Sequence, residues 1–577
     1  MATVDYLLVA AIDLGTTYSG YAYSFRDNQE VVHINQAWNA GTQKLISQKT
    51  PTCLLLNSQE EFHSFGFKAE NKFADLAEDN EHGDWLLFRQ FKMLLHDEKN
   101  LSKELKVVDF NGTRSMPALT IFAMSLKYLK EKLLEDIRGF KDEIVETDIK
   151  YVITVPAIWS DPAKQFMREA AEEAGFDSNR LNIALEPEAA SIWCRIEKET
   201  KTVISGFDTK YIVVDLGGGT ADITVHEVGR DATLKELHKS SGGPWGGTYV
   251  DKNFLQWMTD IFGSKTIERF KSENIADYFD LLRDFEMKKR NVDTDSSVKC
   301  TIKLASSLME IYEKENELTL PDKISDKGLS EQVRVTADKL RIDNAILCGF
   351  FETPLNSLVS HLQNILHKGN IMKNVSTILL VGGFGESKLV QSKVQTHLKT
   401  KRVLSTRDAG LAVVKGAVVF GHEPRIISAR VMKYTYGFKL HLPFNARKHD
   451  KDKAFMLNGE ERVYVFRAIN KADESVEVGY STIMCNMQPR KLDRTIVELY
   501  SSEKDKVMYV TDDGCKKLAT LEVSHPEGKT LADKKFDLTF IFGETELIVK
   551  ARIQKTGREF NTEVNCLQDS ENDASGI

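Results

Sequence analysis

The sequence predicts an α/β region of two similar lobes, followed by an all-β module. Up to about residue 425, apolar strand-like runs alternate with longer segments of helical period, which is typical of α/β folds. Past about residue 430, apolar and polar residues alternate in short segments, as in antiparallel strands. Two distant segments, Ala10–Phe25 and Val213–Val228, share one plan: a strand, Asp-Leu-Gly, a Gly/Thr turn and a second strand. This echo predicts two related halves in the first region.

Four apolar runs are expected to form the buried strands of the first region. They are Leu7–Phe25, Lys150–Trp159, Tyr211–Val228 and Thr377–Ser387. Helices are expected between them. In Thr120–Arg138, apolar residues recur at spacings of three and four, as on one face of a helix. Another helix is expected to begin at Ser160 or Asp161 and to end at Gly175, because serine and aspartate are good N-caps and glycine favours helix ends.

The last strong strand signal is a hairpin near the C-terminus. Apolar and polar residues alternate from Phe536 to Phe542, a turn follows, and the alternation resumes from Leu547 to Ile553. The final ten residues are small, polar and acidic, which is typical of disorder. We therefore predict an α/β domain over residues 1–425, a β module over 426–567 and a disordered tail over 568–577.

Composition limits the class of protein. At roughly 100–200 residues per domain, 577 residues predict about three to five compact units. The 77 Lys and Arg residues against 85 Asp and Glu residues give a net charge of −8, which argues against a dedicated nucleic-acid binder. No apolar run approaches the roughly 20 residues that span a bilayer. Seven cysteines without a C-x-x-C pair favour a reducing compartment, so a cytoplasmic location, or also a nuclear one, is expected.

The two Asp-Leu-Gly turns suggest a chemistry. Successive backbone N–H groups in a turn of glycine and threonine form an anion-binding nest, for which phosphate is a natural ligand. Asp13 and Asp215, which end the first strand of each pair, would repel a phosphate unless a divalent cation lay between them. Mg²⁺ prefers carboxylate, water and phosphate oxygens. The pair therefore predicts magnesium together with a nucleotide.

A single turn of this kind is more often a plain hairpin than a nucleotide site. Two copies of one layout, together with Gly382 and Gly383 after another buried strand, favour a nucleotide cleft between two α/β halves. The sequence contains no P-loop, no dinucleotide-binding glycine motif and no protein-kinase glycine loop. Those solutions to nucleotide binding are therefore not expected.

These segments resemble the actin-like ATPase superfamily and, within it, the heat shock 70 kDa protein family. Five motifs occur in the order of that family: Ile12–Gly20, Val155–Gln165, Leu185–Ile192, Val214–Val225 and Leu379–Ser387. Further likenesses are found in Trp245–Asp251, Phe285–Asn291 and Lys535–Gly557. The resemblance implies a two-lobed actin-like ATPase domain, which is a duplicated ribonuclease-H-like fold, followed by a β-sandwich-like module that binds substrate proteins.

The resemblance also implies a role for each matching residue. Asp13 and Asp215 would hold Mg²⁺ through its waters. The catalytic set would be completed by Lys92, Glu186 and Asp222, near the attacking water. The phosphates of ATP would be cradled by the two turns: Gly15, Thr16, Thr17, Tyr18, Gly217, Gly218, Gly219 and Thr220. Other nucleotide contacts would come from Gly246, Gly247, Glu286, Lys289, Arg290, Gly382 and Gly383.

Several features depart from the usual family pattern. Phe384 and Glu386 stand where the typical member has a small polar residue and a basic one beside the adenine. Glu423–Phe438 replaces the acidic, leucine-rich linker, and too few residues follow the β module for a helical lid. These features resemble the divergent heat shock 70 kDa protein 12 branch. Plainer interpretations stay open for Lys92, as a solvated helix lysine, and for residues 286–290, as an ordinary charged face.

We therefore expect a chaperone-like protein that binds ATP or ADP with Mg²⁺ and hydrolyses ATP slowly. Nucleotide in the cleft would regulate a β module that binds protein or peptide clients, with co-chaperones or nucleotide-exchange factors as further partners. Two alternatives stay open: a nucleotide-sensing adaptor with negligible hydrolysis, and a small-molecule kinase of the sugar-kinase type. The β module argues against the kinase, and only turnover separates the adaptor from the first reading.

Overall fold

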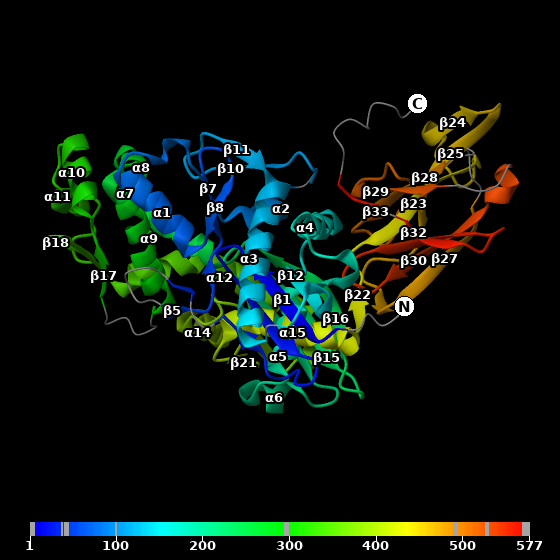
Figure 1. Ribbon diagram of the computed structural model, residues 1–577, viewed down its shortest axis with the longest axis horizontal. Helices are drawn as coiled ribbons and strands as arrows, with labels where there is room; N and C mark the ends of the chain where they lie inside the picture. The colour runs from blue at the N-terminus through cyan, green and yellow to red at the C-terminus, as the bar shows by residue number, and fades with distance from the viewer. Residues whose placement is uncertain are drawn as a thin grey trace.

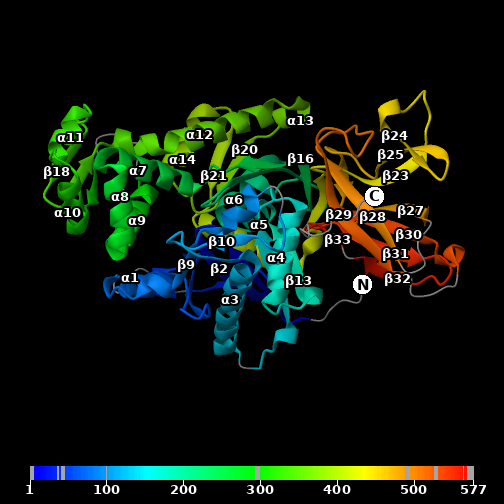
Figure 2. The same cartoon turned by 90° about the horizontal axis from the view of Figure 1, so that it is seen from above.

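The computed structural model describes residues 6–35, 38–39, 46–98, 101–141, 143–292, 299–487, 494–524, 530–562 and 564–567. A mixed α/β region is followed by a C-terminal region of antiparallel sheets. Figures 1 and 2 show an elongated molecule in which the C-terminal sheets lie at one end and helices α7 to α11 at the other. The tail 568–577, predicted to be disordered, lies outside the described residues.

The first large sheet is built on the hairpin predicted near the N-terminus. Its strands follow the order β13 (Leu181–Leu185), β12 (Ile149–Val155), β1 (Leu8–Leu14), β2 (Tyr18–Phe25) and β3 (His33–Ile34), with β6 (Thr50–Pro51) also paired to β2. The first three strands run parallel, whereas β1, β2 and β3 pair antiparallel. Every residue of β1 is buried, as its unbroken apolar run predicted.

The second large sheet repeats this plan. Its first five strands are β21 (Arg402–Ser405), β20 (Thr377–Val381), β14 (Lys210–Leu216), β15 (Ala221–Val228) and β16 (Leu234–Gly243). The pairs β21–β20 and β20–β14 are parallel, and the pairs β14–β15 and β15–β16 are antiparallel. Strand for strand, the second sheet therefore has the connectivity of the first, so the echo seen in the sequence is a repeat of topology.

Two helices in equivalent positions pack between the sheets. α5 (Glu186–Cys194) follows β13, and α15 (Ala412–His422) follows β21 through a short turn. They cross so closely that a Cβ atom on Gly416 would lie 1.7 Å from the carbonyl oxygen of Ala189. Buried residues from both sheets and both helices form one cluster, which includes Val9, Val152, Ala190, Val213, Leu379 and Val414. This cluster makes the two repeats a single body.

Each repeat carries an insertion. The first holds the sheet β8 (Phe62–Phe65), β7 (Cys53–Leu56) and β9 (Leu86–Arg89), with helix α1 (Phe67–Glu78). The second holds the helices α7 (Gly247–Phe262), α8 (Ser264–Glu273), α9 (Ile275–Arg290), α10 (Ser306–Glu315), α11 (Leu320–Asp326) and α12 (Asn344–His367). Figure 1 shows α1 and α9 side by side. The two insertions therefore meet through α1 and α9.

The two helices expected from the sequence are present. α3 spans Ala118–Phe140 and contains the predicted apolar face. α4 spans Asp161–Glu173, has Ser160 as its N-cap residue, and is followed by Gly175 with φ of 84°. In the part of the chain that the structure describes, no helix is both long and apolar enough to cross a membrane.

The C-terminal region contains two antiparallel sheets around one core. One sheet has the order β24 (Ala454–Leu457), β25 (Glu460–Ala468), β23 (Thr435–Pro443), β28 (Arg494–Ser502), β29 (Cys515–Ser524) and β33 (Val564–Asn565). The other has the order β27 (Tyr480–Met487), β30 (Phe536–Phe542), β31 (Ile548–Ile553) and β32 (Glu559–Thr562). The predicted hairpin is β30–β31, whose phenylalanines are buried in the shared core.

The segment between the two regions belongs to both. β22 (Ile427–Val431) pairs parallel with β16 of the second sheet and antiparallel with β26 (Ser475–Glu477). The boundary at residues 425/426 stays a prediction, because the second sheet of the α/β region continues across it. The replaced linker is thus a strand of that sheet.

Side chains fasten the C-terminal sheets to the α/β region. Arg430 of β22 donates to both carboxylate oxygens of Glu188, at 2.7 and 2.6 Å, and to the carbonyl oxygen of Gly543 in the β30–β31 turn. On α4, Arg168 forms an ion pair with Glu546, with nitrogen–oxygen distances of 2.7 and 2.5 Å. The β30–β31 turn is therefore held from two sides.

Glu236 is a buried carboxyl beside this junction, and we expect its protonation to affect stability. Burial, and then the charge of Glu188, raise the pKa of Glu236 to about 8, and its carboxyl accepts a hydrogen bond from the N–H of Val431. A raised carboxyl pKa stabilises the fold at low pH, and that contribution is lost as the pH rises through about 8. We expect the stability difference between wild type and Glu236→Gln to fall by on the order of 2 to 4 kcal/mol between pH 5 and pH 9. Unfolding by urea across that pH range tests this, and a constant difference would contradict it.

Candidate functional site

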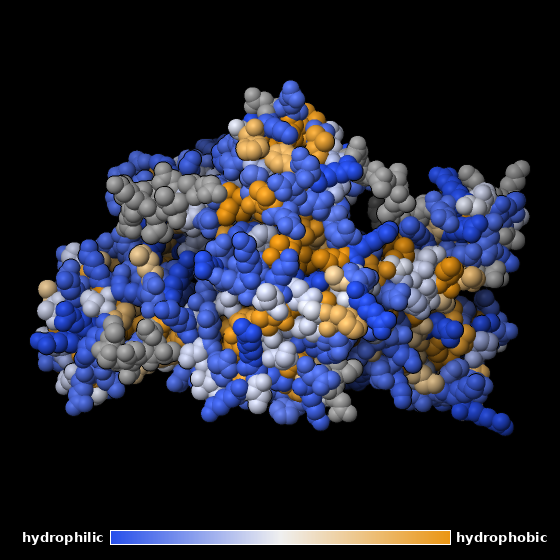
Figure 3. Space-filling view, turned by 90° about the horizontal axis from the view of Figure 1, so that it is seen from below, coloured by the Kyte–Doolittle hydropathy of each residue, from blue (hydrophilic) through white to orange (hydrophobic). Residues whose placement is uncertain are grey.

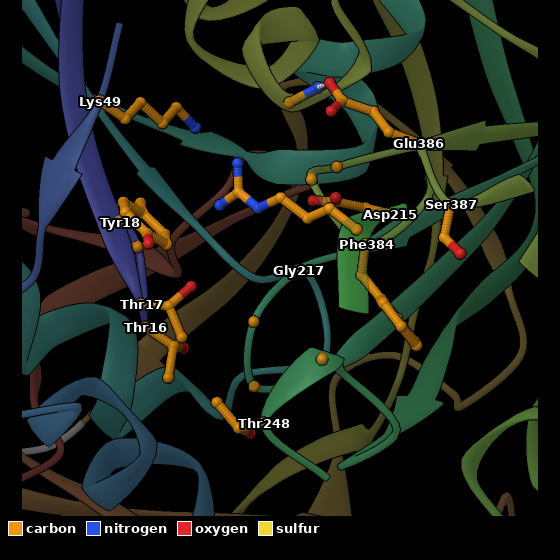
Figure 4. Close-up of a pocket in the computed structure, with 18 of the residues that line it drawn as sticks. Thr16, Thr17, Tyr18, Lys49, Asp215, Gly217, Thr248, Phe384, Glu386 and Ser387 are labelled. Atoms are coloured by element: carbon orange, nitrogen blue, oxygen red, sulfur yellow. Dashed lines mark hydrogen bonds between the residues drawn. The ribbon is translucent and has the colours of Figure 1, made fainter. Parts of the chain in front are cut away.

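A cavity of about 570 Å³ lies where the turns of the two repeated hairpins face each other. Residues of both sheets, of α9 and of the segment after β20 line it. Figure 4 shows Thr16, Thr17 and Tyr18 on one side of this space, with Gly217 and Asp215 across from them. Both repeats therefore contribute equivalent turns to one cavity.

The two turns have the same register. In the first hairpin, Asp13 pairs with Gly20, and in the second, Asp215 pairs with Asp222. In each case a leucine follows the aspartate and four residues form the turn. The two aspartates thus occupy equivalent places at the ends of β1 and β14, and the turn that follows each of them lines the cavity.

Close packing explains the glycines of the second turn. A Cβ atom on Gly218 would lie 2.3 Å from the Thr17 hydroxyl oxygen, so a side chain there would force the two turns apart. Gly382 follows β20 with φ of 80°, and a Cβ atom on it would lie 2.4 Å from a carboxylate oxygen of Asp215. Glycine is therefore required both for the backbone conformation and for space beside the aspartate.

Two lysines pair with two carboxylates near the two turns that line the cavity. Lys49 Nζ lies 2.7 Å from Asp13, which also accepts from the Thr154 hydroxyl at 3.0 Å. Burial would raise the pKa of Asp13, but the charges of Lys49 and Lys92 lower it below its ordinary value. Lys92 Nζ lies 2.6 Å from Glu186, and burial raises the pKa of Glu186 in spite of this contact.

The other two carboxylates, Asp215 and Asp222, are buried close to further negative charges. Burial, and then the charges of Glu186 and Asp222, raise the pKa of Asp215 well above its ordinary value. Asp222 lies outside the cavity lining and accepts hydrogen bonds from the backbone N–H groups of Ala157 and Ile158. Burial, and then the charge of Glu186, raise the pKa of Asp222 to about 7. A cation beside Asp215 would relieve this repulsion.

The end of α9 forms the opposite wall. Lys289 Nζ lies 2.7 Å from Asp251 and 2.5 Å from Glu286, and Arg290 lies 2.7 Å from Glu286. The Arg290 guanidinium also lies 5.1 Å from the centre of the Tyr18 ring, in a cation–π contact between the two repeats. These side chains are thus an ion-pair network that lines the cavity.

Comparisons with known proteins show the family of this chain. A family model described as Hsp70 protein matches residues 9–321. Heat shock 70 kDa protein 12A of Mus musculus is 35% identical, over 96% of this chain and 92% of that protein. The chain belongs to the Hsp70 family. Heat shock 70 kDa protein 12B of Homo sapiens is 32% identical over 98% of this chain and 91% of that protein, and the chaperone protein dnaK of Cyanidium caldarium is 26% identical over 74% and 63%. The resemblance seen in the motifs is confirmed.

Membership in the Hsp70 family implies ATP binding and a chaperone-like role. In this Hsp70 protein, most residues predicted for the site line the one cavity: Asp13, Gly15, Thr16, Thr17, Tyr18, Lys92, Glu186, Asp215, Gly217, Gly218, Gly219, Thr220, Gly247, Glu286, Lys289, Arg290, Gly382 and Gly383. Gly246 and Asp222 are buried behind the second turn instead. A Cβ atom on Gly246 would lie 2.5 Å from the carbonyl oxygen of Gly218, so Gly246 supports that turn.

Lys92 is not a solvated lysine. It lies in a single 3₁₀ turn, Phe91–Met93, and its side chain is only 3% exposed. Besides Glu186, its ammonium contacts the Trp159 ring at 5.3 Å from the ring centre. A buried lysine held this way has a fixed position at the cavity.

The residues that depart from the usual Hsp70 pattern also face the cavity. Phe384 stacks on Phe351, with ring centres 5.9 Å apart, so this side chain is held within the core of the second repeat. Glu386 accepts a hydrogen bond from the N–H of Gly410 at 2.8 Å. This wall of the cavity in the present Hsp70 protein is therefore aromatic and acidic.

Sequence reasoning missed some lining residues, mainly Lys49, Thr248 and Ser387. Thr248 and Ser387 belong to quoted motifs and could have been found by their position. The hydroxyl of Ser387 is buried and has no hydrogen-bond partner among the described residues. Lys49 carries no local signal, because only the pairing of β6 with β2 brings it to the cavity.

The part of the cavity that Asp13 and Asp215 line suits magnesium. Among the residues that the structure describes, no group of three or more His, Cys, Asp or Glu side chains is arranged to hold a metal ion. Mg²⁺ in nucleotide sites keeps several waters and uses one or two carboxylates plus phosphate oxygens, so it does not need such a group. Asp215, with its raised pKa and neighbouring carboxylates, is the side chain whose charge a bound cation would best offset. The residues present therefore fit the ion.

Proposed function

We propose that this Hsp70 protein binds Mg²⁺ and ATP between its two repeats and hydrolyses ATP slowly. The observation that carries the proposal is the pair of hairpins in one register, whose aspartates and Gly/Thr turns face each other across one cavity. The repeated strand order supports the actin-like plan of a duplicated ribonuclease-H-like fold. We propose that residues 1–425 form the ATPase domain and that residues 426–567 form a β-sandwich-like domain.

Each residue of the site would have a definite task. The backbone N–H groups of the turns at 15–18 and 217–220 would bind the phosphate oxygens. Asp13 and Asp215 would hold Mg²⁺, which offsets the negative charge of the phosphates when bound. Lys92 and Glu186, fixed by their 2.6 Å contact, would orient the attacking water, and the Glu186 carboxylate would accept its proton. Catalysis would thus rest on positioning and electrostatics.

The β module is proposed to bind protein clients under control of the nucleotide. Its exposed apolar side chains include Met456, Ile483 and Ile496, each more than half exposed. Ile483 lies on β27, an edge strand that an extended chain could extend. The face in Figure 3 is mostly hydrophilic, with hydrophobic residues in small separate groups. Client contact is therefore proposed at the edge strand β27 and at single exposed side chains. We also propose a cytoplasmic or nuclear location.

A nucleotide-sensing adaptor is the second candidate. Lys49 already neutralises Asp13, one of the two carboxylates proposed for the metal, which favours binding without rapid hydrolysis. Both candidates predict nucleotide binding, and only the first predicts turnover. No described feature favours a small-molecule kinase over these two.

Calorimetric titration with ATP and with ADP, both with Mg²⁺, followed by a single-turnover assay on the same sample, tests the proposal. We expect binding of both nucleotides and a slow first-order release of phosphate. Binding without phosphate release would favour the adaptor, and absence of binding would overturn both candidates.

Replacing Lys92 with alanine should slow the single-turnover rate roughly 100-fold, because a fixed cation beside the reacting phosphate is lost. ATP affinity should change much less, since the turns still bind the phosphates. Lys127→Ala on the exposed face of α3 is the matched control and should keep the wild-type rate. A Lys92→Ala protein with the full rate would remove Lys92 from the proposed mechanism.

Binding of the client should depend on the nucleotide. We expect the full-length protein to bind a reduced, permanently unfolded protein with an affinity that differs at least about threefold between ATP and ADP. Fluorescence anisotropy with a labelled probe measures this. Equal affinities in both nucleotides would contradict regulation of the β module by the cleft.

A further inference from the structure

Lys49 enters the cavity from a strand pairing that lies outside the family motifs. It directly precedes β6, whose Thr50 and Pro51 pair with Ser19 and Tyr18 of β2. Its own backbone is held by Ser47, which exchanges hydrogen bonds with the Lys49 carbonyl oxygen at 2.6 Å and N–H at 3.3 Å. Figure 4 shows the Lys49 side chain extending into the cavity. A fixed backbone thus delivers a cation to the part of the cavity near the two turns.

The first hairpin makes room for this lysine. A Cβ atom on Gly20 would lie 3.0 Å from Cγ and 3.8 Å from Cδ of Lys49, so the bare glycine leaves space for the lysine stem. Gly20 is the residue opposite Asp13, and the equivalent place in the second hairpin holds Asp222. At this matched position the two repeats therefore differ in charge: the first admits a cation, and the second adds a carboxylate.

Charge balance shows what the cation does. Asp13, Glu186, Asp215 and Asp222 form the acidic cluster, and Lys92 is committed to Glu186 at 2.6 Å. Lys49 pairs with Asp13 at 2.7 Å and lines the same cavity as Glu186 and Asp215. Its side chain is 18% exposed, so it is less enclosed than the Lys92 side chain at 3%. Lys49 is thus the more accessible of the two cations beside the acidic cluster.

We propose that Lys49 supplies from the protein part of the positive charge that a nucleoside triphosphate needs in this cleft, so that ATP binding depends less on Mg²⁺ than the acidic cluster alone would allow. The inference rests on the proposed function. An ammonium that already lies beside Asp13 can share its N–H groups with a phosphate oxygen, because a lysine carries three donors. Mg²⁺ and Lys49 would therefore partly substitute for each other.

The test compares ATP affinity in excess Mg²⁺ and in excess EDTA, by calorimetry on the full-length protein. Lys49→Met keeps the stem and removes the charge. In EDTA we expect this variant to bind ATP roughly ten- to hundredfold more weakly than wild type, the range for loss of a charged hydrogen bond. In saturating Mg²⁺ we expect a loss below about threefold, because the ion supplies the missing charge. Lys49→Arg should restore most of the affinity in EDTA.

Lys388 provides a matched control. It is an exposed cavity-lining residue at the start of α14 (Lys388–His397), so Lys388→Met removes the same charge away from the acidic cluster. Its effect should be equal in Mg²⁺ and in EDTA. A second readout is the dependence of ATP affinity on Mg²⁺ concentration. This dependence should be stronger for Lys49→Met than for wild type.

The outcomes separate this inference from the function on which it rests. If wild type binds ATP but Lys49→Met loses the same factor in both conditions, or none in EDTA, the inference is overturned and the proposed function stands. If wild type binds ATP in neither condition, the proposed function fails, and the inference with it. Unfolding midpoints of the Lys49 variants, expected within a few degrees of wild type, exclude loss of fold as the cause of weaker binding.

Discussion

Replacing Asp13 with asparagine is expected to reduce the single-turnover rate of ATP hydrolysis at least about 100-fold. Asp13 ends β1 at the place that Asp215 occupies in the second repeat, and the two carboxylates are proposed to hold the metal together. The amide keeps the shape of the side chain and its contact with Thr154, so the fold should change little. The phosphate-binding turns remain, so ATP affinity should fall much less than the rate.

This experiment needs a control for Lys49, because the amide leaves that lysine without its anionic partner at 2.7 Å. The double variant Asp13→Asn, Lys49→Met restores the local charge balance. If Asp13 serves the metal, the double variant stays as slow as the single one. Recovery of the rate in the double variant would show that Asp13 only neutralises Lys49. Phosphate release from a single turnover measures both proteins.

Asp408→Asn is the matched control for an aspartate outside the cavity. Asp408 pairs with Lys415 at 2.9 Å, and its side chain is about half exposed. Its loss removes the same charge and should leave the rate within about twofold of wild type, because Asp408 does not line the cavity. A similar loss of rate in this variant would show that net charge, and not the position of Asp13, decides hydrolysis.

Local chemistry made much of the site predictable from the sequence. The two turns of glycine and threonine behind aspartates fixed the two hairpins, and their equal registers follow from equal spacing. The glycines could also be predicted, because no other residue tolerates the approach of Gly218 to Thr17 or the positive φ of Gly382. Buried strands such as β1 and β14 were predictable for the same reason, since their apolar runs leave no polar face.

Long-range pairing explains what sequence reasoning could not reach. Lys49 is brought to the cavity by a short strand with no periodicity, and nothing local marks it. Asp222 lies on β15, and the sequence does not show which group its carboxylate contacts. Only the path of the chain after β12 brings the backbone N–H of Ala157 to it as a hydrogen-bond donor. The sequence of the junction segment indicated only a linker that departs from the family pattern. In the structure, β22 in this segment pairs with the edge of β16 and extends the sheet.

The junction places a buried ion pair within two residues of the cleft. Glu186, at the start of α5, contacts Lys92 in the cavity, and Glu188 in the same helical turn contacts Arg430 of β22. The side chains of Arg430 and Glu188 are 8% and 3% exposed. Any movement of α5 would therefore act on Arg430, and through its bond to Gly543 on the β30–β31 hairpin. The pair is thus a direct side-chain link from α5, which begins at the cavity, to β22 and the β30–β31 turn.

Replacing Arg430 with methionine should therefore detach β22 and the β30–β31 turn from the α/β region. Removing one partner of a buried ion pair leaves an uncompensated charge, which costs about 3–5 kcal/mol. Hydrogen exchange of the β22 amides, which bond to β16 and β26, should report a fall of that size in the opening free energy. The nucleotide dependence of client binding should disappear in the same variant.

Two further variants decide whether burial of the charge is the cause. The double variant Glu188→Met, Arg430→Met removes both charges and should recover protection to within about 1 kcal/mol, because apolar residues replace a buried pair at little cost. Arg168→Met breaks the ion pair with Glu546 at the same junction, but the side chains of Arg168 and Glu546 are each 24% exposed, so the loss should be clearly smaller than for Arg430→Met. If Arg168→Met lowers protection as much as Arg430→Met, the number of contacts, and not the buried charge, holds the junction. If the double variant keeps its protection but loses nucleotide dependence, the ion pair transmits the signal without being needed to dock the module.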